Sequence, residues 1–411
     1  MTVSAAHNSY PIAVIGGGLA GKMMALCLVY SGYDCAIIAP HPQSDKGKDR
    51  RSTTIHNAGA KMLSALGLMG YLQDKITAIH HIAVAVGPQK PYHSDWLLNW
   101  SSDEVMAYVV ENHALDSALD KAIAELANAA PDCGTIHQID DQVTGYDDDG
   151  MRGIIQTASG TSISAQLVVA CDGTNSQMRD LVGLTATVEE TGQTALIANL
   201  DCTIDHDHTA YQRFLPTGPI ALMPLEGQSV SLVWSTDSAQ AETLLSADAE
   251  VVSQALGAAF GDELGKLTPQ GALSSFPLRP HYNHRLSKGR VILAGDAAHA
   301  IHPLAGMGYN LALADAAILL DLLNEARANG LSPDHPTIKT AYRNRRMPEI
   351  IALATLTSQL NKMLSRKSGP LSNIIAMGMS VVDKTPLKQR FQDIAMGGKL
   401  SSAPLLNGRL T

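Results

Sequence analysis

The sequence offers its first candidate for binding chemistry close to its start. The segment GGGLAG at 16–21 satisfies the pattern GxGxxG, and it lies between an apolar run at 12–15 and a helix-like stretch at 19–30. Glycines at this spacing allow a tight turn and let the backbone approach a pyrophosphate, whose charge the N-terminus of the following helix stabilises. The pattern therefore predicts a dinucleotide-binding turn. The residues expected to contact the dinucleotide are Gly16, Gly18, Leu19, Ala20 and Gly21.

One expected part of this pattern is absent. An acidic residue at the end of the second strand usually binds the ribose hydroxyls of the dinucleotide. The sequence ends that run with Ile38, Ala39 and Pro40 instead. Either the ribose is held differently, or another group such as Arg51 supports it.

A second candidate begins where another apolar run ends. In LVVACDGTNSQMR, residues 167–179, the run leads into Asp172 and Gly173. Such a turn offers a carboxylate and an unhindered backbone at the end of a strand. Taken alone, the pattern fits a ligand-binding turn and a plain strand-ending turn equally well.

The third candidate is the longest, RVILAGDAAHAIHPLAGMGYNLALADAAILL at 290–320. An apolar strand at 291–294 ends at Gly295 and Asp296, and a loop rich in proline and glycine then leads into a helix. A carboxylate at the end of a strand can accept hydrogen bonds from a polyol, and a helix N-terminus can stabilise negative charge. The loop and helix residues of interest are Pro303, Gly306, Met307, Gly308 and Asn310.

Metal chemistry is not expected from this segment. His299 and His302 are three residues apart, but no third ligand stands in a matching motif. We therefore interpret both as loop histidines that support their surroundings, and we predict no metal site.

Composition excludes several classes of protein. With 45% apolar and 17% charged residues, the 411-residue chain can bury a sizeable core. A net charge of −9 and only 4% aromatic residues argue against a nucleic-acid partner. The five cysteines are scattered without a CxxC pair, which favours a reducing compartment. The apolar stretch from Ile12 to Tyr30 is interrupted by Lys22 and four glycines, so we expect a soluble, cytoplasmic protein and no membrane span there.

These candidates need elements that bring them together. The order strand, turn, helix, strand over residues 12–38 begins a parallel α/β sheet. Residues 105–130 predict a strand that runs into an amphipathic helix, and Asp149-Gly150 predicts a hairpin. Residues 185–275 alternate in short strand-like pieces, which indicates a second, sheet-rich domain. After about residue 310 nearly everything predicts helix.

Together the motifs resemble a known group of enzymes. GGGLAG, CDGTNSQMR and LAGDAAHAIHPLAGMGYN resemble, in this order, the three successive fingerprints of the FAD-dependent aromatic hydroxylases, the group that contains p-hydroxybenzoate hydroxylase. The segments at 49–68, 210–227 and 341–350 narrow the resemblance to the hydroxylases of ubiquinone biosynthesis. The likeness runs from about residue 11 to about residue 397.

The resemblance implies roles for individual residues. Arg51 would contact FAD, Asp172 and Gly173 belong to a motif associated with FAD and NAD(P)H, and Asp296 would bind the ribityl chain. The glycine turn would cradle the pyrophosphate, and Pro303 with the loop 305–308 would border the isoalloxazine ring. The sequence departs from the group at Ala39, Met307, Ala312 and Ala314, which removes polar groups from the site. No residue is named as a catalytic base.

The resemblance also implies a fold and a division of the chain. The fold is α/β, a Rossmann-like GxGxxG FAD-binding domain with an inserted β-sheet-rich substrate domain and a C-terminal helical region. We expect the FAD-binding domain to comprise residues 1–75, 105–184 and 276–340. The substrate domain would comprise 76–104 and 185–275, and the helical region 341–411.

The implied activity is that of a flavoprotein monooxygenase, which uses NAD(P)H and O2 to hydroxylate the aromatic ring of a polyprenylated phenol in ubiquinone biosynthesis. Two alternatives stay open: a flavin hydroxylase or reductase for another aromatic or lipid substrate, and a weakly active flavoprotein subunit of a biosynthetic complex. Residues 361–411 hold eight basic and two acidic residues, and IIAMGMSVV at 374–382 is apolar. This tail is either an ordinary packed helix or a peripheral contact with the inner face of a membrane.

Overall fold

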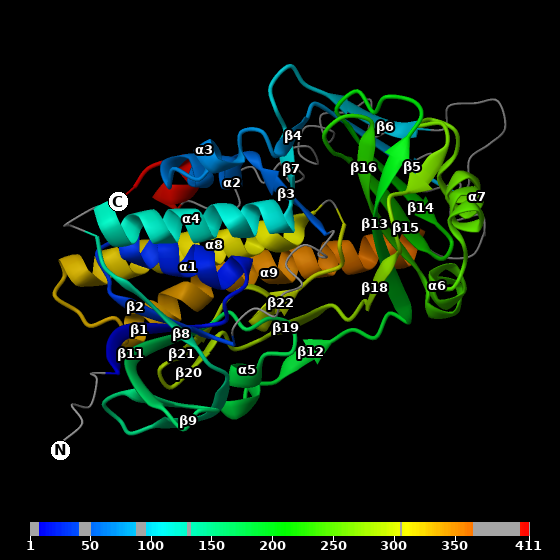
Figure 1. Ribbon diagram of the computed structural model, residues 1–411. Helices are drawn as coiled ribbons and strands as arrows, with labels where there is room; N and C mark the ends of the chain where they lie inside the picture. Colours follow the sequence, from blue (N-terminus) through cyan, green and yellow to red (C-terminus); the bar gives the residue numbers. More distant parts are fainter. Residues whose placement is uncertain are drawn as a thin grey trace.

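The computed structural model describes residues 8–40, 51–87, 96–129, 133–304, 306–364 and 403–410. In this part of the chain, an eight-stranded sheet carries the glycine turn (Figure 1). Its central strands lie in the order β21-β11-β1-β2-β8 and are all parallel, with β20 antiparallel at one edge. The bounds are β1 Ser9–Ile15, β2 Cys35–Ala39, β8 Ile136–Asp140, β11 Ser162–Ala170, β20 Ser287–Lys288 and β21 Val291–Leu293.

An antiparallel hairpin extends this sheet at the start of β11. It consists of β9, Val143–Asp148, and β10, Gly153–Thr157, on either side of the predicted Asp149-Gly150 turn. Gly150 has a φ of +85°, a backbone conformation that glycine adopts without strain. The hairpin prediction is therefore confirmed.

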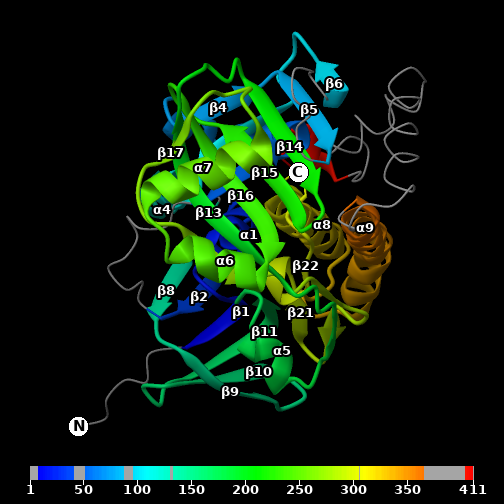
Figure 2. The ribbon, with the colours of Figure 1, turned by 90° about the vertical axis from the view of Figure 1, so that its right-hand side faces the viewer.

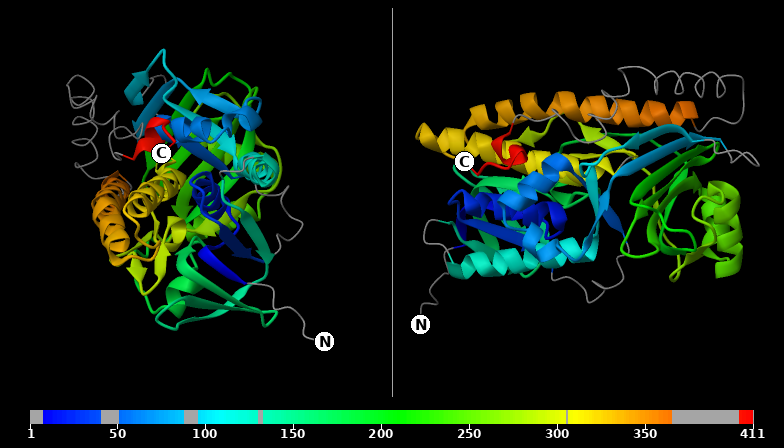
Figure 3. Two further views of the ribbon diagram at one scale, coloured as in Figure 1. Left: turned by 90° about the vertical axis from the view of Figure 1, so that its left-hand side faces the viewer. Right: turned by 90° about the horizontal axis from the view of Figure 1, so that it is seen from above.

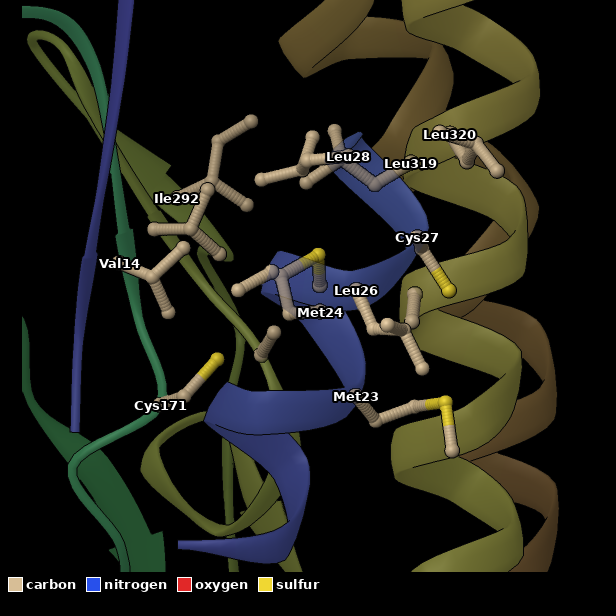
Figure 4. Packing of buried hydrophobic residues seen from close by; sticks show 14 of the residues in the cluster. Val14, Met23, Met24, Leu26, Cys27, Leu28, Cys171, Ile292, Leu319 and Leu320 are labelled. Carbon is tan, nitrogen blue, oxygen red and sulfur yellow. The ribbon is translucent and has the colours of Figure 1, made fainter. Parts of the chain in front are cut away.

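Long helices lie together on one side of this sheet. They are α1 Leu19–Tyr30, which packs on β1 and β2, α4 Asn112–Ala129 and α8 Met307–Ala328, which pack on α1, and α9 Pro336–Leu364, which packs on α8. Every α1 residue from Gly21 to Val29 is buried, because α1 lies between the strands and α8 (Figure 4). The apolar stretch from Ile12 to Tyr30 is thus a strand, a turn and a buried helix. No described helix is long and apolar enough to cross a membrane.

The second large sheet is formed by the residues predicted to be sheet-rich, joined by two earlier strands. Its order is β17-β13-β16-β15-β14-β5-β6, and β18 also pairs with β13. The helices α6, Ser238–Leu245, and α7, Ala249–Phe260, pack on it (Figure 2). The strand bounds are β5 His81–Val86, β6 Trp96–Ser101, β13 Gln193–Cys202, β14 Thr209–Leu215, β15 Gly218–Pro224, β16 Ser229–Asp237, β17 Leu267–Pro269 and β18 Ser274–Pro277.

Two small sheets lie between these large ones. One has the order β3-β7-β4 and the other β12-β19-β22. Their bounds are β3 Ser52–His56, β4 Ile76–Ile79, β7 Ala107–Glu111, β12 Ala186–Val188, β19 His281–Asn283 and β22 His299–Ala300. The remaining short helices are α2 Asn57–Ala65, α3 Met69–Leu72, α5 Gln177–Leu181, η1 Gly295–Ala297 and η2 Pro404–Asn407.

The helix α9 connects the two large sheets along the length of the molecule (Figure 3). Near its start, the Tyr342 hydroxyl donates to the carbonyl oxygen of Leu293 in the first sheet at 3.2 Å. Near its end, the Asn361 amide donates to Gln193 Oε1 in the second sheet at 2.9 Å. The tail segment 374–382 and its basic neighbours lie outside the described residues.

Candidate functional site

The glycine turn between β1 and α1 is open on one side. A Cβ on Gly16 would lie 2.4 Å from the Cys171 carbonyl oxygen, and one on Gly21 would lie 1.9 Å from the Gly16 carbonyl oxygen. Backbone packing therefore requires both glycines. Gly18 differs, because a Cβ there would meet no atom within 4 Å. Gly18 is also the N-cap of α1 and has no side chain, so the helix N-terminus has room beside it for an anionic group such as a pyrophosphate.

The three motifs converge on this turn. A Cβ on Gly16 would lie 3.0 Å from the Asp172 Cα of the second motif. In the third motif, a Cβ on Gly295 would lie 3.1 Å from the Cβ of Ala20, which belongs to the GGGLAG segment and lies in the first turn of α1. The parallel strands β1, β11 and β21 explain this convergence, because their carboxyl ends lie side by side.

The Asp172 carboxylate is engaged within its own turn. It accepts hydrogen bonds from Ser176 Oγ at 2.5 Å and from the Met178 backbone N–H at 3.0 Å. Gly173 has a φ of +83° and open space around the position of a Cβ. The side chain of Asp172 therefore shapes the turn, whereas the backbone of Gly173 is the accessible part.

Arg179 ties the second motif to the third. Its guanidinium donates to the Thr174 carbonyl oxygen at 3.1 Å and to the Ala297 carbonyl oxygen at 3.3 Å. Sequence reasoning did not single out this residue, although it ends the CDGTNSQMR motif. The sequence offers only a basic residue in the short helix α5 after the turn, and its partner Ala297 lies more than a hundred positions further along the chain.

Asp296 occupies the tip of the third strand. Its side chain is exposed to solvent, yet the protein around it desolvates the carboxyl enough to raise its pKa. The positive charges of His299, His281 and Arg51 oppose that rise. Arg51 therefore lies within electrostatic reach of Asp296, as a shared site requires. The His281 ring contacts the backbone of this turn, because its Nε2 lies 3.0 Å from the Asp296 carbonyl oxygen.

A buried ionic network holds this turn from behind. The Asp315 carboxylate accepts from the Gly295 backbone N–H at 2.7 Å, from His299 Nε2 at 2.8 Å and from Arg346 Nε at 2.6 Å. Arg346 also contacts Glu349. Burial alone would raise the pKa of Asp315, but the charges of His299 and Arg346 lower it to about 2. His299 is thus a supporting residue, and among the described residues no group of three or more candidate ligands could hold a metal.

The loop before α8 is fastened to β3. Gly306, with a φ of +62°, is the N-cap of α8, and a Cβ there would lie 2.5 Å from the Thr54 Cβ. The Asn310 amide donates to the carbonyl oxygens of Thr54 at 2.7 Å and Gly306 at 3.0 Å, and its Oδ1 accepts from the His56 backbone N–H. The side chain of Asn310 therefore positions the loop. Gly308 again has open space where a Cβ would be.

The other loop residues face apolar surroundings. The Met307 side chain is buried with Leu311 of α8 and Leu353 of α9, which explains why an apolar residue stands there. Leu304, next to the half-buried Pro303, packs with Phe214 of the second sheet. Ala305 lies outside the described residues. The loop thus runs between the small β3-β7-β4 sheet and strand β14 of the second large sheet.

The chain matches the family model described as an FAD binding domain over residues 9–347. The chain belongs to this FAD-binding family. Among curated proteins, it is 32% identical over 397 residues to the ubiquinone hydroxylase UbiL of Rhodospirillum rubrum, covering 94% of this chain and 89% of the relative. It is 28% identical to the 3-demethoxyubiquinol 3-hydroxylase of Escherichia coli, covering 92% and 96%. The resemblance to the ubiquinone-biosynthesis hydroxylases is therefore confirmed.

Solved structures show the same fold. The p-nitrophenol 4-monooxygenase PnpA of Pseudomonas putida superposes with a TM-score of 0.76 at 17% identity, covering 95% of this chain and 99% of that one. HpxO of Klebsiella pneumoniae, complexed with FAD and uric acid, gives a TM-score of 0.73 at 19% identity, with coverages of 95% and 98%. The chain is thus an FAD-dependent monooxygenase of the aromatic-hydroxylase fold, as predicted, and its cofactor is FAD.

Proposed function

We propose that this family member hydroxylates the aromatic ring of a polyprenylated phenol in ubiquinone biosynthesis, with NAD(P)H and O2 as co-substrates. The convergence of the three motifs on the glycine turn carries this proposal: Gly16 lies against Asp172, and Gly295 lies against Ala20, so all three motifs border the place assigned to FAD. The names of the relatives support the ring hydroxylation and the pathway. The balance is one NAD(P)H, one proton and one O2 consumed, with one oxygen atom inserted into a ring C–H bond and the other leaving as water.

We assign the cofactor to the residues that converge. The backbone of the turn at 16–21 would hold the pyrophosphate, Asp296 would accept hydrogen bonds from the ribityl chain, and Arg51 and the backbone of Gly173 would flank it. The loop at 303–308 would border the isoalloxazine ring. FAD bound there would supply the redox chemistry, the transfer of two electrons from NAD(P)H to O2.

The chain's own residues orient the reactants and exclude water. The N-terminus of α8, capped by Gly306, directs its backbone N–H groups toward the loop and favours negative charge there. Phe214, Leu304 and Leu364 form an apolar contact where the second sheet meets the loop. An aromatic ring placed between the loop and this contact would be shielded from bulk water.

We also propose the domain division stated above. The pairing of β5 with β14 and of β6 with β5 supports the assignment of 76–104 to the substrate domain. A peripheral membrane contact through the tail at 374–390 would bring the polyprenyl chain to the site. The alternative of a different aromatic or lipid substrate is separated from the main proposal by the substrate test below.

Three measurements test the proposal. Purified protein should be yellow with about one FAD per chain, and a polyprenylated phenol should stimulate NAD(P)H oxidation more than a short soluble phenol does. A knockout should accumulate a partly hydroxylated quinone precursor. Colourless protein that takes up no added FAD contradicts the assignment of the site. Equal stimulation by both phenols favours the alternative substrate.

A further inference from the structure

The adenosine end of the cofactor site lacks the acid that normally stands at the tip of β2. Ala39 occupies that position, and its methyl group offers no hydrogen bond. A Cβ built on Gly17 would lie 2.9 Å from the Ala39 Cβ, so the Ala39 side chain faces the glycine turn. A carboxylate for the ribose hydroxyls has to come from elsewhere if this chain uses one.

The neighbouring strand places a carboxylate at the same level. β8 lies parallel to β2, and Asp140 pairs directly with Ala39. The Asp141 N–H donates to the Ala39 carbonyl oxygen at 3.0 Å, so the pairing holds to the strand ends. Residues paired across adjacent strands point to the same face, and the strands lie about 4.8 Å apart. Asp140 therefore faces the side of the sheet on which Ala39 meets the glycine turn.

A cavity joins these residues. It has a volume of about 790 Å³ and is lined by Gly17, Gly18, Ala39 and Asp140. Gln138 also lines it, two residues before Asp140 and on the same face of β8. The cavity thus begins at the N-terminus of α1, where the pyrophosphate is assigned, and extends to the Asp140 carboxylate. This is the direction in which the adenosine half of a dinucleotide must continue.

A second carboxylate borders the cavity from the side of α4. Asp120 also lines the cavity, but its Oδ1 lies 2.5 Å from Lys22 Nζ, which Asp116 contacts at the same distance. That buried lysine joins α1 to α4 and offsets one of the two negative charges. Arg51, the alternative considered from the sequence, lies near Asp296.

We propose that Asp140 replaces the carboxylate missing at position 39 and accepts hydrogen bonds from the ribose hydroxyls of the adenosine half of FAD. This assignment rests on the placement of FAD proposed above. It makes the third parallel strand, rather than the second, the source of the ribose acceptor in this chain.

The test is the dissociation constant of FAD, measured by fluorescence quenching with the apoprotein. Asp140→Ala should weaken FAD binding roughly 10- to 100-fold, since a charged acceptor is lost. Asp262→Asn, an exposed change of the same charge in the loop after α7, should leave binding unchanged. Adding Ala39→Glu to Asp140→Ala should restore affinity, because a glutamate at 39 faces the same side. The melting temperatures of the apoproteins should agree, which separates lost binding from lost folding.

A second ligand locates the contact on the ribose. An FAD analogue that lacks the adenosine 2′-hydroxyl should bind wild-type protein more weakly than FAD does. The affinity of this analogue should not fall further with Asp140→Ala, because the 2′-hydroxyl and the Asp140 carboxylate are the two partners of one interaction. If Asp140→Ala binds FAD within about twofold of wild type while Gly18→Ala loses affinity, the role of Asp140 is wrong and the FAD site stands. If wild-type protein binds no FAD, both proposals fail.

Discussion

At the scale of single residues, the glycines of the turn differ in what a side chain would meet. Gly16 and Gly21 lie against backbone carbonyl groups, whereas Gly18 lies against nothing within 4 Å. The first two serve the fold, and the third leaves room for the cofactor. Substitution by alanine separates these roles.

Gly18→Ala should preserve the fold and impair the cofactor site. The Gly18 backbone, with φ −79° and ψ −177°, suits any residue, so the apoprotein should change in stability by no more than about 1 kcal/mol. FAD affinity should fall at least about tenfold, because the methyl group displaces the pyrophosphate. Titration with FAD and thermal melting of the apoprotein measure the two effects. Unchanged affinity would place the pyrophosphate elsewhere.

Gly21→Ala should instead prevent normal folding. Its Cβ would lie 1.9 Å from the Gly16 carbonyl oxygen, which only a movement of α1 against β1 can relieve. We expect a loss of more than about 4 kcal/mol in unfolding free energy, seen as a low melting temperature or insoluble protein. A variant that melts like wild type would contradict the close packing of the turn.

His302 makes stability depend on pH. The ring is buried, its Nε2 lies 3.3 Å from Gln193 Oε1, and burial lowers its pKa to about 4, a shift that Glu189 partly opposes. The unfolded chain, with a histidine pKa near 6.5, binds more protons than the folded chain between about pH 4 and pH 6.5. Stability should therefore be complete above that window and fall as the pH decreases through it.

Urea denaturation at two pH values measures this contribution. Between about pH 7.5 and pH 5, His302 should account for a loss of about 2 kcal/mol in unfolding free energy. His302→Gln removes the titrating ring, so its loss over the same range should be smaller by that amount. His281, whose pKa is also lowered by burial, is present in both proteins and cancels in the comparison. Equal losses in the two proteins would contradict the assignment.

At the scale of elements, Asp315 joins four of them. The carboxylate on α8 binds the backbone of η1, the ring of His299 on β22 and the guanidinium of Arg346 on α9. Asp315 and Arg346 are both fully buried. The turn that presents Asp296 is therefore fixed by an ion network on its protein side.

Asp315→Asn should destabilise the protein by about 3–5 kcal/mol, because it leaves the buried Arg346 without its full counter-charge. Asp321→Asn is the matched control: it lies on the same helix and also pairs with an arginine of α9, Arg345, but both side chains reach solvent. That change should cost less than about 1 kcal/mol. Thermal or urea unfolding compares the two, and similar losses would show that the buried network contributes no more than a surface pair.

Much of this level could be predicted from the sequence, since periodicity and turn residues are local signals. The helix at 19–30, the hairpin at Asp149-Gly150 and the strands around the three motifs are where the patterns place them. The Asp315–Arg346 pair could not be predicted, because helical periodicity indicates that each residue lies in a helix but does not indicate which helices pack together. The engagement of Asn310 with β3 escaped for the same reason: its partners are more than 250 residues away.

At the scale of the whole molecule, the cofactor site is assembled from segments that the chain visits at widely separated points. FAD should therefore protect 16–21, 172–179 and 295–308 together against hydrogen exchange, although they share no local sequence. With free FAD at 100 times its dissociation constant, the apoprotein should gain about 2.7 kcal/mol in stability. Mass spectrometry of exchanged peptides measures the first effect and melting the second. Protection limited to one segment would contradict a shared site.

The long helix α9 has a mechanical consequence. Its 29 residues, spanning about 43 Å, are bonded at Tyr342 to the first sheet and at Asn361 to the second. Rotating the two large sheets apart would require these buried hydrogen bonds to break or the helix to bend. The two large sheets are therefore expected to keep a fixed separation while a substrate enters and leaves.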